Sequence, residues 1–121
     1  MSWGTWIGVA LLGGLGASLR VLVTAAADRR AATAFPVGTL SVNLIATFAA
    51  GVITGAALTG TTRIVLLAGL LGTFSTFSTW MLDTHRLAAD GRRGLAALNL
   101  ALSLVAGLLA VWAGERLGCA L

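Results

Sequence analysis

The segment from Gly69 to Trp80 (GLLGTFSTFSTW) contains the side chains in this sequence that are best suited to receiving an ion or a small solute. It continues an apolar run, Ile64 to Ala68, and then changes to glycine and hydroxyl residues where a membrane helix would continue with hydrocarbon. Backbone groups that lose their helical partners at membrane depth are tolerated only where they are buried in protein or line a wet cavity. We therefore expect a helix that breaks here, with an ion or solute site at the break.

Hydroxyl and aromatic side chains alternate around the break. They occur in the order Phe74, Ser75, Thr76, Phe77, Ser78, Thr79 and Trp80, and Asp83 follows. On a continuing helix, residues 76, 79, 80 and 83 would share one face, so hydroxyls, an indole and a carboxylate could line one path. Serine and threonine in membrane helices also bond back to their own helix, but the density of hydroxyls here favours a path.

The composition places this segment in a membrane protein. Of 121 residues, 58% are hydrophobic and 10% are charged, and the mean hydropathy is +0.96, which is too apolar for a domain with a solvated surface. Since a span needs about 20 apolar residues, we predict one all-α membrane domain over 1–121 with spans at 3–23, 35–58, 64–83 and 94–114. The polar segments Asp28 to Arg30 and Thr84 to Arg93 are expected to be loops. No nucleophile, base and orienting group occur together, so an enzyme is not expected.

Two of the predicted spans carry polar and small residues at every fourth position. The second span has Thr39, Asn43, Thr47, Gly51 and Gly55, and the fourth has Asn99, Ser103 and Gly107. This spacing places each set on one face of a helix. A packing seam between helices would explain the glycines and threonines. It explains Asn43 less well, because a carboxamide in mid-membrane needs hydrogen-bond partners.

Arg20 ends a face of small residues on the first span, which also includes Gly13 and Ala17. Small residues on one face suit close packing against another helix. The guanidinium itself has two open interpretations. It either extends to the lipid headgroups from the end of the span, or it makes an aqueous vestibule positive, since charges within spans are often functional.

The net charge of +4 comes from arginines that are scattered singly or in pairs. This distribution argues against nucleic-acid binding and favours a signal for orientation in the membrane. Apart from Arg20, two arginines (Arg63 and Arg116) lie on one side, and the other side holds Arg29, Arg30, Arg86, Arg92 and Arg93. The bias favours both termini outside. The single cysteine, Cys119, has no partner for a disulfide or a cysteine-based metal site.

Three stretches together resemble the Fluc (CrcB) family of bacterial fluoride channels. The run GLLGTFSTFSTW is similar to the family signature, which reads approximately GxxGGxTTFSTF. GGLGASLR at 13–20 resembles the family's first-helix motif, and FPVGTLSVN at 35–43 resembles its PxGTLxxN. The motifs occur in order and, with the serine of the fourth span, cover essentially the whole chain.

The resemblance implies a multi-pass protein of the bacterial plasma membrane that exports cytoplasmic fluoride passively. It implies a four-helix subunit in an antiparallel dimer, with two fluoride pores and one structural sodium ion at the centre. The backbone carbonyl groups of Gly72 and Ser75 from both subunits would hold the sodium. Carbonyl oxygens on unwound backbone suit a small hard cation.

The resemblance also implies roles for individual side chains. The vestibule would be marked by Arg20 and Asp83, and the fluoride path would comprise Asn43, Phe77, Ser78, Thr79, Trp80 and Ser103. Fluoride is small and strongly hydrated, so hydroxyl and carboxamide donors must replace its water shell. The positive edges of aromatic rings can also face an anion. The central cation and Arg20 would attract anions without placing a charge in the path.

Four positions depart from the family pattern, namely Thr73, Ser75, Trp80 and Asn99. Trp80 matters most, because an indole is larger than a phenyl ring and adds an N–H donor. With the charge bias, it leaves open a heterodimer with a paralogous subunit in place of a homodimer, in which this chain is a half-degenerate or non-conducting partner. A small four-helix drug or cation exporter is a weaker alternative. It needs a titratable carboxylate deep in a span, whereas Asp83 and Glu115 lie near span ends.

Overall fold

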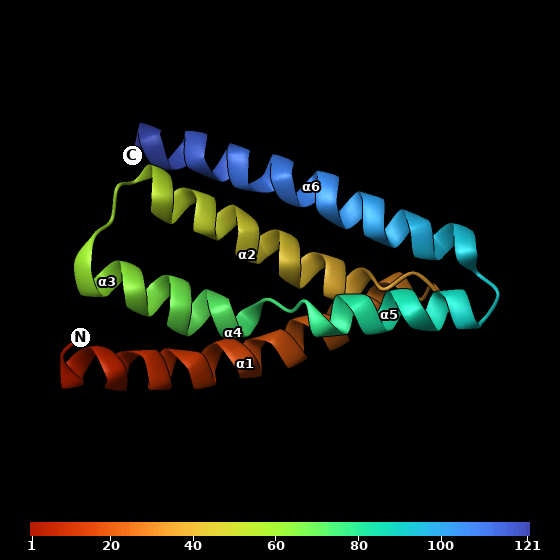
Figure 1. The fold of residues 1–121 in the computed structure, drawn as a ribbon, viewed down its shortest axis with the longest axis horizontal. Helices are drawn as coiled ribbons and strands as arrows, with labels where there is room; N and C mark the ends of the chain where they lie inside the picture. Colours follow the sequence, from red (N-terminus) through yellow and green to blue (C-terminus); the bar gives the residue numbers. More distant parts are fainter.

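The computed structural model describes residues 1–121 and contains helices and no strands. Four helical units are long and apolar enough to cross a membrane: α1 (Trp3–Ala31), α2 (Val37–Gly55), a third unit over Gly60–Ala89, and α6 (Arg93–Ala120). They run along an elongated molecule, and both termini lie at the same end (Figure 1). The predicted all-α membrane fold with four spans is confirmed.

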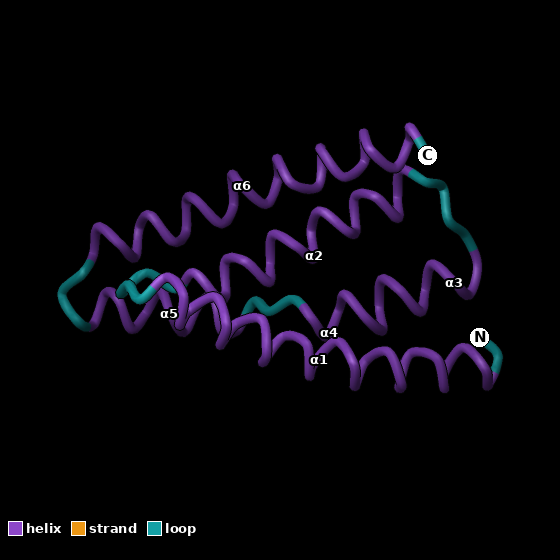
Figure 2. Tube along the Cα trace, turned by 180° about the vertical axis from the view of Figure 1, so that it is seen from behind, coloured by secondary structure: helices purple, strands orange, loops and turns teal.

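The third unit is broken near its middle, as the sequence predicts. It begins with α3 (Gly60–Ile64), continues as the π-helix η1 (Val65–Leu71) and the short α4 (Gly72–Phe74), and resumes as α5 (Ser78–Ala89). The residues between α4 and α5 are not helical, and Ser75 has the extended backbone angles φ −75° and ψ 163°. The break is visible as a thin loop between two helical halves (Figures 1 and 2). The sequence pattern does not predict the π-helix.

Two segments that were expected to be loops are helical. Asp28 to Arg30 belong to the end of α1, and Thr84 to Ala89 belong to α5. The expectation is wrong because polar residues end an apolar span without ending the helix. Arginine, which occurs in both segments, and the leucine and alanines of the second segment are strong helix formers. The connections therefore shrink to short turns beyond the charged ends of the helices.

The α2 and α6 helices pack along each other (Figures 1 and 2), and glycines bring their backbones into contact. Gly51 and Gly114 are both buried. A Cβ on Gly51 would overlap the carbonyl oxygen of Val111, and a Cβ on Gly114 would overlap that of Phe48. The glycine half of the stripe on α2 is therefore a packing seam of the kind that small residues form between membrane helices.

The α1 helix contacts both the third unit and the start of α2. Gly13 and Gly16 are buried, and a Cβ on Gly16 would overlap the carbonyl oxygen of Leu70, so α1 packs closely against the third unit at Gly16, beside the predicted face of small residues. Farther along α1, an oxygen of Asp28 accepts a 2.7 Å hydrogen bond from the backbone N–H of Gly38. The carboxylate thus caps the first turn of α2, whose N–H groups have no partner within the helix.

Few side chains are buried within a single chain. Only 15 of 121 residues are buried, whereas Trp3, Leu11 and Leu104 are exposed by 85%, 69% and 59%. Soluble monomers do not expose contiguous apolar surface on this scale. Such a surface fits contact with lipid, or with another chain, along all four spans.

Candidate functional site

The carboxamide of Asn43 holds the broken backbone of the third unit. Its Nδ2 donates to the carbonyl oxygen of Thr76 at 2.9 Å, and its Oδ1 accepts from the N–H of Thr76 at 2.8 Å. One side chain of α2 thus satisfies both backbone groups that Thr76 exposes by leaving the helix, as is required at membrane depth. These are the partners that the sequence demanded for a carboxamide in mid-membrane.

The hydroxyl of Thr76 starts the second half of the third unit. Its Oγ1 accepts from the backbone N–H of Thr79 at 3.2 Å, as a helix-capping side chain does, and donates to the hydroxyl oxygen of Thr79 at 3.1 Å. Since α5 begins at Ser78, Thr76 is not on the helical face that was expected to run through residues 76, 79, 80 and 83. That expectation is wrong because the helix is broken there, although the two hydroxyls still meet.

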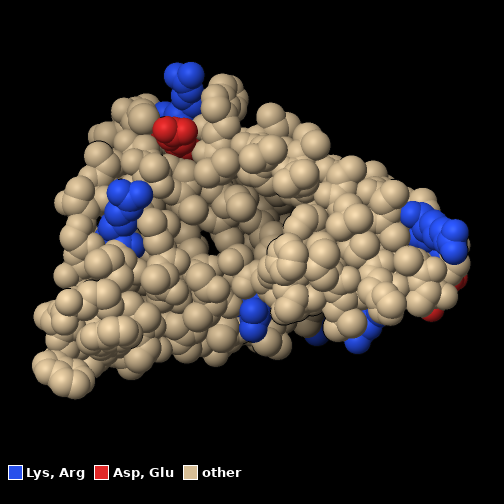
Figure 3. Space-filling model, in the orientation of Figure 1, with Lys and Arg blue, Asp and Glu red and all other residues tan.

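A groove with a volume of about 420 Å³ lies beside the break, between α2 and α6. Its remaining walls are aliphatic or glycine, and its polar and aromatic lining consists of Asn43, Thr47, Ser75, Thr76, Phe77, Trp80 and Ser103. No charged side chain lines it. The space-filling view shows the molecule hollowed near its middle, whereas most charged side chains gather toward its ends (Figure 3).

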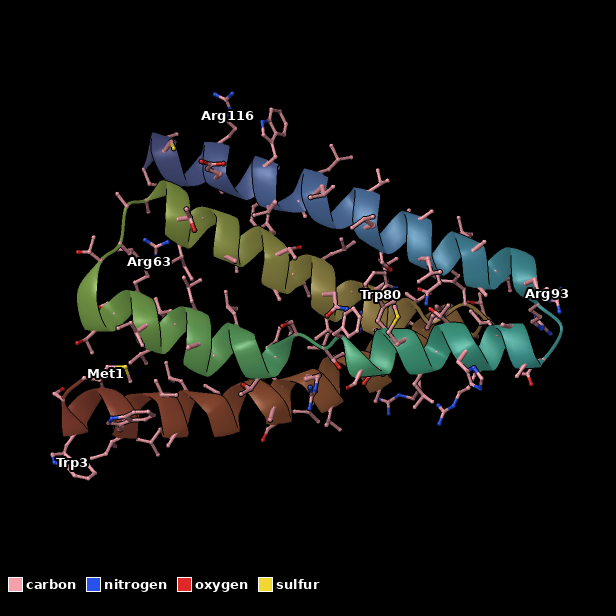
Figure 4. The ribbon with its side chains drawn as sticks, viewed as in Figure 1. Met1, Trp3, Arg63, Trp80, Arg93 and Arg116 are labelled. Carbon is pink, nitrogen blue, oxygen red and sulfur yellow. The ribbon has the colours of Figure 1, made fainter.

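Phe77 and Trp80 form the aromatic wall of the groove. Their ring centroids are 5.7 Å apart and their planes are inclined by 84°, an edge-to-face arrangement. Phe77 is 70% exposed in the single chain. Trp80, labelled in Figure 4, donates its indole N–H to the backbone carbonyl of Asn99 on α6 at 3.2 Å. Because that N–H is already used, Trp80 offers the groove a ring and no free donor.

Polar contacts continue from Trp80 along α5 and α6. The hydroxyl of Ser103 donates to Oδ1 of Asn99 at 3.4 Å, and Nδ2 of Asn99 donates to Oγ1 of Thr84 at 2.9 Å. The Thr84 hydroxyl in turn donates to the carbonyl oxygen of Trp80 at 2.8 Å. The polar stripe of α6 is therefore joined to the first turns of α5.

Arg20 is directed toward the break rather than toward the end of its helix. Its Nη1 donates to the carbonyl oxygen of Ser75 at 3.4 Å. With Thr24, Thr76 and Thr79, it lines a second cavity of about 430 Å³ between α1 and the third unit. Because Thr76 lines both this cavity and the groove, the two spaces adjoin at the break. The guanidinium of Arg20 therefore faces this cavity rather than the end of α1.

Asp83 links α5 to α2. The buried hydroxyl of Thr39 donates to Oδ2 of Asp83 at 2.7 Å, and the exposed guanidinium of Arg86 lies 4.0 Å from Oδ1. Asp83 lines neither the groove nor the cavity beside Arg20. The carboxylate lies one helical turn beyond Trp80 and stabilises the packing of α5 on α2.

Comparison with known proteins places this arrangement in a family. The family model described as CrcB-like protein, Camphor Resistance (CrcB), matches residues 7–115, a range that includes the break and part of every helical unit. This chain belongs to the CrcB family. The predicted resemblance is therefore confirmed.

Curated relatives match the CrcB-family chain over most of their length. Fluoride-specific ion channel FluC 2 of Mycobacterium tuberculosis is 43% identical over 110 residues, covering 91% of this chain and 87% of the relative. Fluoride-specific ion channel FluC 1 of Symbiobacterium thermophilum is 42% identical over 120 residues, covering 94% and 97%. The FluC of Citrifermentans bemidjiense is 39% identical over 118 residues, covering 93% and 95%. With four spans and bacterial relatives, the chain is a multi-pass bacterial membrane protein.

In this CrcB-family chain, most of the predicted path residues meet at the groove. Its lining includes Asn43, Phe77, Trp80 and Ser103, whereas Thr79 lines the cavity beside Arg20 and the exposed Ser78 lines neither space. The groove is also lined by Ser75, which the resemblance assigns to the sodium site, and by two hydroxyl residues that the resemblance does not assign to the path, Thr47 and Thr76. Both belong to the polar patterns of their segments, so their positions, though not their contacts, could have been found from the sequence.

Gly72 and Ser75 lie together where α4 ends. They line a third cavity, of about 210 Å³, between α2 and the third unit. The last carbonyl groups of a helix lack intrahelical partners, and the negative end of a half-helix suits a cation. The Ser75 carbonyl also accepts the hydrogen bond from Arg20, so it is shared with a guanidinium.

Proposed function

We propose that this chain is a subunit of a fluoride channel through which cytoplasmic fluoride leaves the cell passively, which reduces its toxicity. The observation that carries the proposal is the groove beside the helix break, where an asparagine, a serine and two aromatic rings face one uncharged space. Relatives that are 39% to 43% identical over most of the chain are named fluoride-specific ion channels. A CrcB-family channel subunit is not an enzyme, and no nucleotide-binding motif indicates energy coupling.

The groove presents only some of its polar atoms as donors. The Nδ2 of Asn43 carries two protons, and only one is used on the carbonyl of Thr76, so the other can reach an ion in the groove. The hydroxyl of Thr47, in contrast, donates back to the carbonyl of Asn43 at 2.9 Å. Fluoride would thus meet a few neutral donors, with the ring edges of Phe77 and Trp80 nearby.

The positive charge that attracts the anion stands outside the groove. Arg20 lines the adjoining cavity and donates to the carbonyl oxygen of Ser75, the first residue of the break. A guanidinium at that position raises the local concentration of anions at the break. It does not bind the ion within the groove, where a strong ion pair would slow its release.

A structural sodium ion at the end of α4 is part of the proposal. The carbonyl oxygens of Gly72 and Ser75 are ligands of the right chemistry, and their end of the half-helix is its negative end. Two carbonyl groups from one chain are too few to enclose a cation, so a second chain would supply the others. Sodium would fix the two breaks relative to each other.

The same reasoning supports a dimer, which the resemblance to the family implies is antiparallel. Phe77 is 70% exposed in a single chain although it lines the groove, so the groove needs a further wall. That wall would come from a second copy or from a paralogous subunit. Two relatives carry the number 2 or 1 in their names, which is consistent with bacteria that encode two paralogous chains of this family. The excess of arginine at one end supports the paralogous pair, because a chain inserting both ways should show little bias.

The alternative functions find less support in the geometry. A proton-coupled drug or cation exporter needs a carboxylate in the path, and neither Asp83 nor Glu115 lines the groove. A non-conducting subunit predicts polar stripes without a shared space between them. The stripes of α2 and α6 instead contribute Asn43, Thr47 and Ser103 to one groove.

Fluoride efflux from liposomes tests the proposal. The purified chain is compared with Phe77→Ile and Asn43→Ala, and efflux is followed with a fluoride electrode. The parent chain is expected to release fluoride and both variants to release it at least about tenfold more slowly, because each loses a ring or a donor of the path. Equal leak from all three would reject the pore assignment. No efflux from the chain alone, with efflux restored by a co-expressed paralogue, would show the heterodimer.

A further inference from the structure

Asn99 is a completely buried carboxamide that stands behind the groove without lining it. Two groups that do line the groove are bonded to it. Its backbone carbonyl accepts the indole N–H of Trp80 at 3.2 Å, and its Oδ1 accepts the hydroxyl proton of Ser103 at 3.4 Å. Asn99 therefore holds two donors of the groove lining, the indole N–H of Trp80 on α5 and the hydroxyl of Ser103 on α6. An ion in the groove would not touch Asn99 itself.

Thr84 fixes which way the Asn99 amide points. The hydroxyl of Thr84 has a single proton, which it donates to the carbonyl oxygen of Trp80 at 2.8 Å. Its oxygen can then only accept, and it accepts from Nδ2 of Asn99 at 2.9 Å. A reversed amide would set two lone pairs against each other. The amide nitrogen consequently stays on Thr84, and the amide oxygen stays on the side of Ser103.

This orientation occupies the only proton of Ser103. While that proton is directed at Asn99, the groove sees the lone pairs of the serine oxygen, which repel an anion. The oxygen–oxygen distance of 3.4 Å is longer than the usual range for hydroxyl donors, of about 2.5–3.0 Å. The bond is therefore weak, and a stronger acceptor in the groove can withdraw the proton.

We propose that Asn99 is a positioning residue that holds the Ser103 proton away from the groove until fluoride takes it. Each fluoride that binds at Ser103 must then compete with Oδ1 of Asn99, so Asn99 lowers the affinity of the groove and favours release. Chloride accepts hydrogen bonds more weakly than fluoride and competes less well, so the same contact raises selectivity. This inference rests on the proposed function, since it concerns the same path.

The test replaces Asn99 by leucine, which has a similar size and no acceptor. The Trp80 bond goes to the backbone carbonyl of residue 99 and is retained in Asn99→Leu. We expect the fluoride concentration for half-maximal efflux from liposomes to fall by about threefold to tenfold, the equivalent of one hydrogen bond, and the fluoride-to-chloride permeability ratio to fall with it. In an Ser103→Ala background, Asn99→Leu should change neither quantity, because no proton remains to be released.

Thr84→Val provides a second, independent variant. It removes the acceptor that orients Asn99, so the amide can reverse and leave the Ser103 proton free. The half-saturating concentration should fall as in Asn99→Leu. Folding is checked by Trp80 fluorescence in a background that carries Trp3→Phe, Trp6→Phe and Trp112→Phe. There the emission of Asn99→Leu should match its parent because the indole hydrogen bond persists.

The outcomes separate the two proposals. If the parent chain, alone or with a paralogue, passes no fluoride, the proposed function fails and the role of Asn99 fails with it. If the parent conducts but both variants keep its half-saturating concentration, only the role of Asn99 is rejected. If Asn99→Leu raises the half-saturating fluoride concentration equally with and without Ser103→Ala, Asn99 has a purely structural role, and the positioning role is also rejected.

Discussion

Asn43 and Thr76 lie 33 positions apart in the sequence and form a closed pair of hydrogen bonds, in which one carboxamide satisfies both backbone groups of the other residue. The pair makes the break in the third unit a defined structure rather than a frayed helix. It also places the second N–H of Asn43 beside the groove, so one residue both stabilises the break and serves the path.

Asn43→Asp should impair both contributions. An aspartate can still accept from the Thr76 N–H, but it cannot donate to the Thr76 carbonyl, and it brings a negative charge to the groove. We expect fluoride efflux to fall at least about tenfold and stability to fall by about 1–3 kcal/mol. Thr47→Val is the matched control: Thr47 lines the same groove, but its proton is directed at its own helix, so efflux should stay within about twofold.

Arg20 should act through its charge. Arg20→Gln keeps donor atoms near the Ser75 carbonyl and removes the charge, so fluoride efflux at low ionic strength should fall by about threefold to tenfold. The difference from the parent should shrink as inert salt is added, because salt screens the field of the guanidinium. Arg116→Gln is the control, since that arginine lies over Trp112 at the far end of α6. If the reduction of efflux in Arg20→Gln does not depend on the salt concentration, the vestibule role of Arg20 is contradicted.

Trp80→Phe should leave the path open. The phenyl ring keeps an aromatic edge at the groove, and the indole N–H that is lost serves α6 rather than the ion. We expect efflux within about threefold of the parent and a loss of about 1 kcal/mol in stability from the missing hydrogen bond. Trp80→Leu should lower efflux much further, because it removes the ring. If Trp80→Phe conducts far better than the parent, the tryptophan obstructs the pore.

The glycine seam between α2 and α6 should tolerate no side chain. In Gly51→Ala, the added methyl group would overlap the Val111 carbonyl oxygen, and we expect a loss of about 1–3 kcal/mol in a detergent unfolding titration. Gly14→Ala makes the same change where no atom lies within 4 Å, and it should be neutral or stabilise by up to about 1 kcal/mol. Equal effects at both positions would refute close packing at the seam.

Asp28 should stabilise the start of α2. Asp28→Ala removes the 2.7 Å bond to the Gly38 N–H and should reduce stability by about 1 kcal/mol, whereas Asp28→Asn keeps an acceptor and should lose less. Thermal unfolding of the purified variants measures both. Asp90→Ala, outside the helices on the last short turn, is the control. A loss for Asp28→Asn equal to that for Asp28→Ala would show that the charge matters rather than the hydrogen bond.

The number of spans and the break in the third unit could be predicted because both depend on local composition. Apolar runs specify spans, and glycine with hydroxyls interrupts one. The requirement for partners at Asn43 was also visible, although the sequence could not identify Thr76, because that contact depends on how α2 meets the break. Helix ends could not be predicted from polarity, since the charged ends of α1 and α5 contain strong helix formers.

Two features of the site lay beyond the sequence for physical reasons. The four-residue stripe on α2 divides its residues between two tasks, and only the packing of α6 shows that Gly51 belongs to the seam while Asn43 belongs to the groove. The N–H of Trp80 could have pointed into the path. It does not, because the carbonyl of Asn99 lies within 3.2 Å on the neighbouring helix.

Met1 and Leu121 lie at the same end of the molecule because four helical units, an even number, run from one end of the molecule to the other (Figure 1). A short peptide tether from the last residue of one copy to the first residue of the next would therefore orient both copies the same way. Covalent joining of two oppositely inserted copies requires a tether that itself crosses the bilayer, with about 20 apolar residues of its own. Tandem fusions built with and without such a crossing tether would reveal the relative orientation of the subunits.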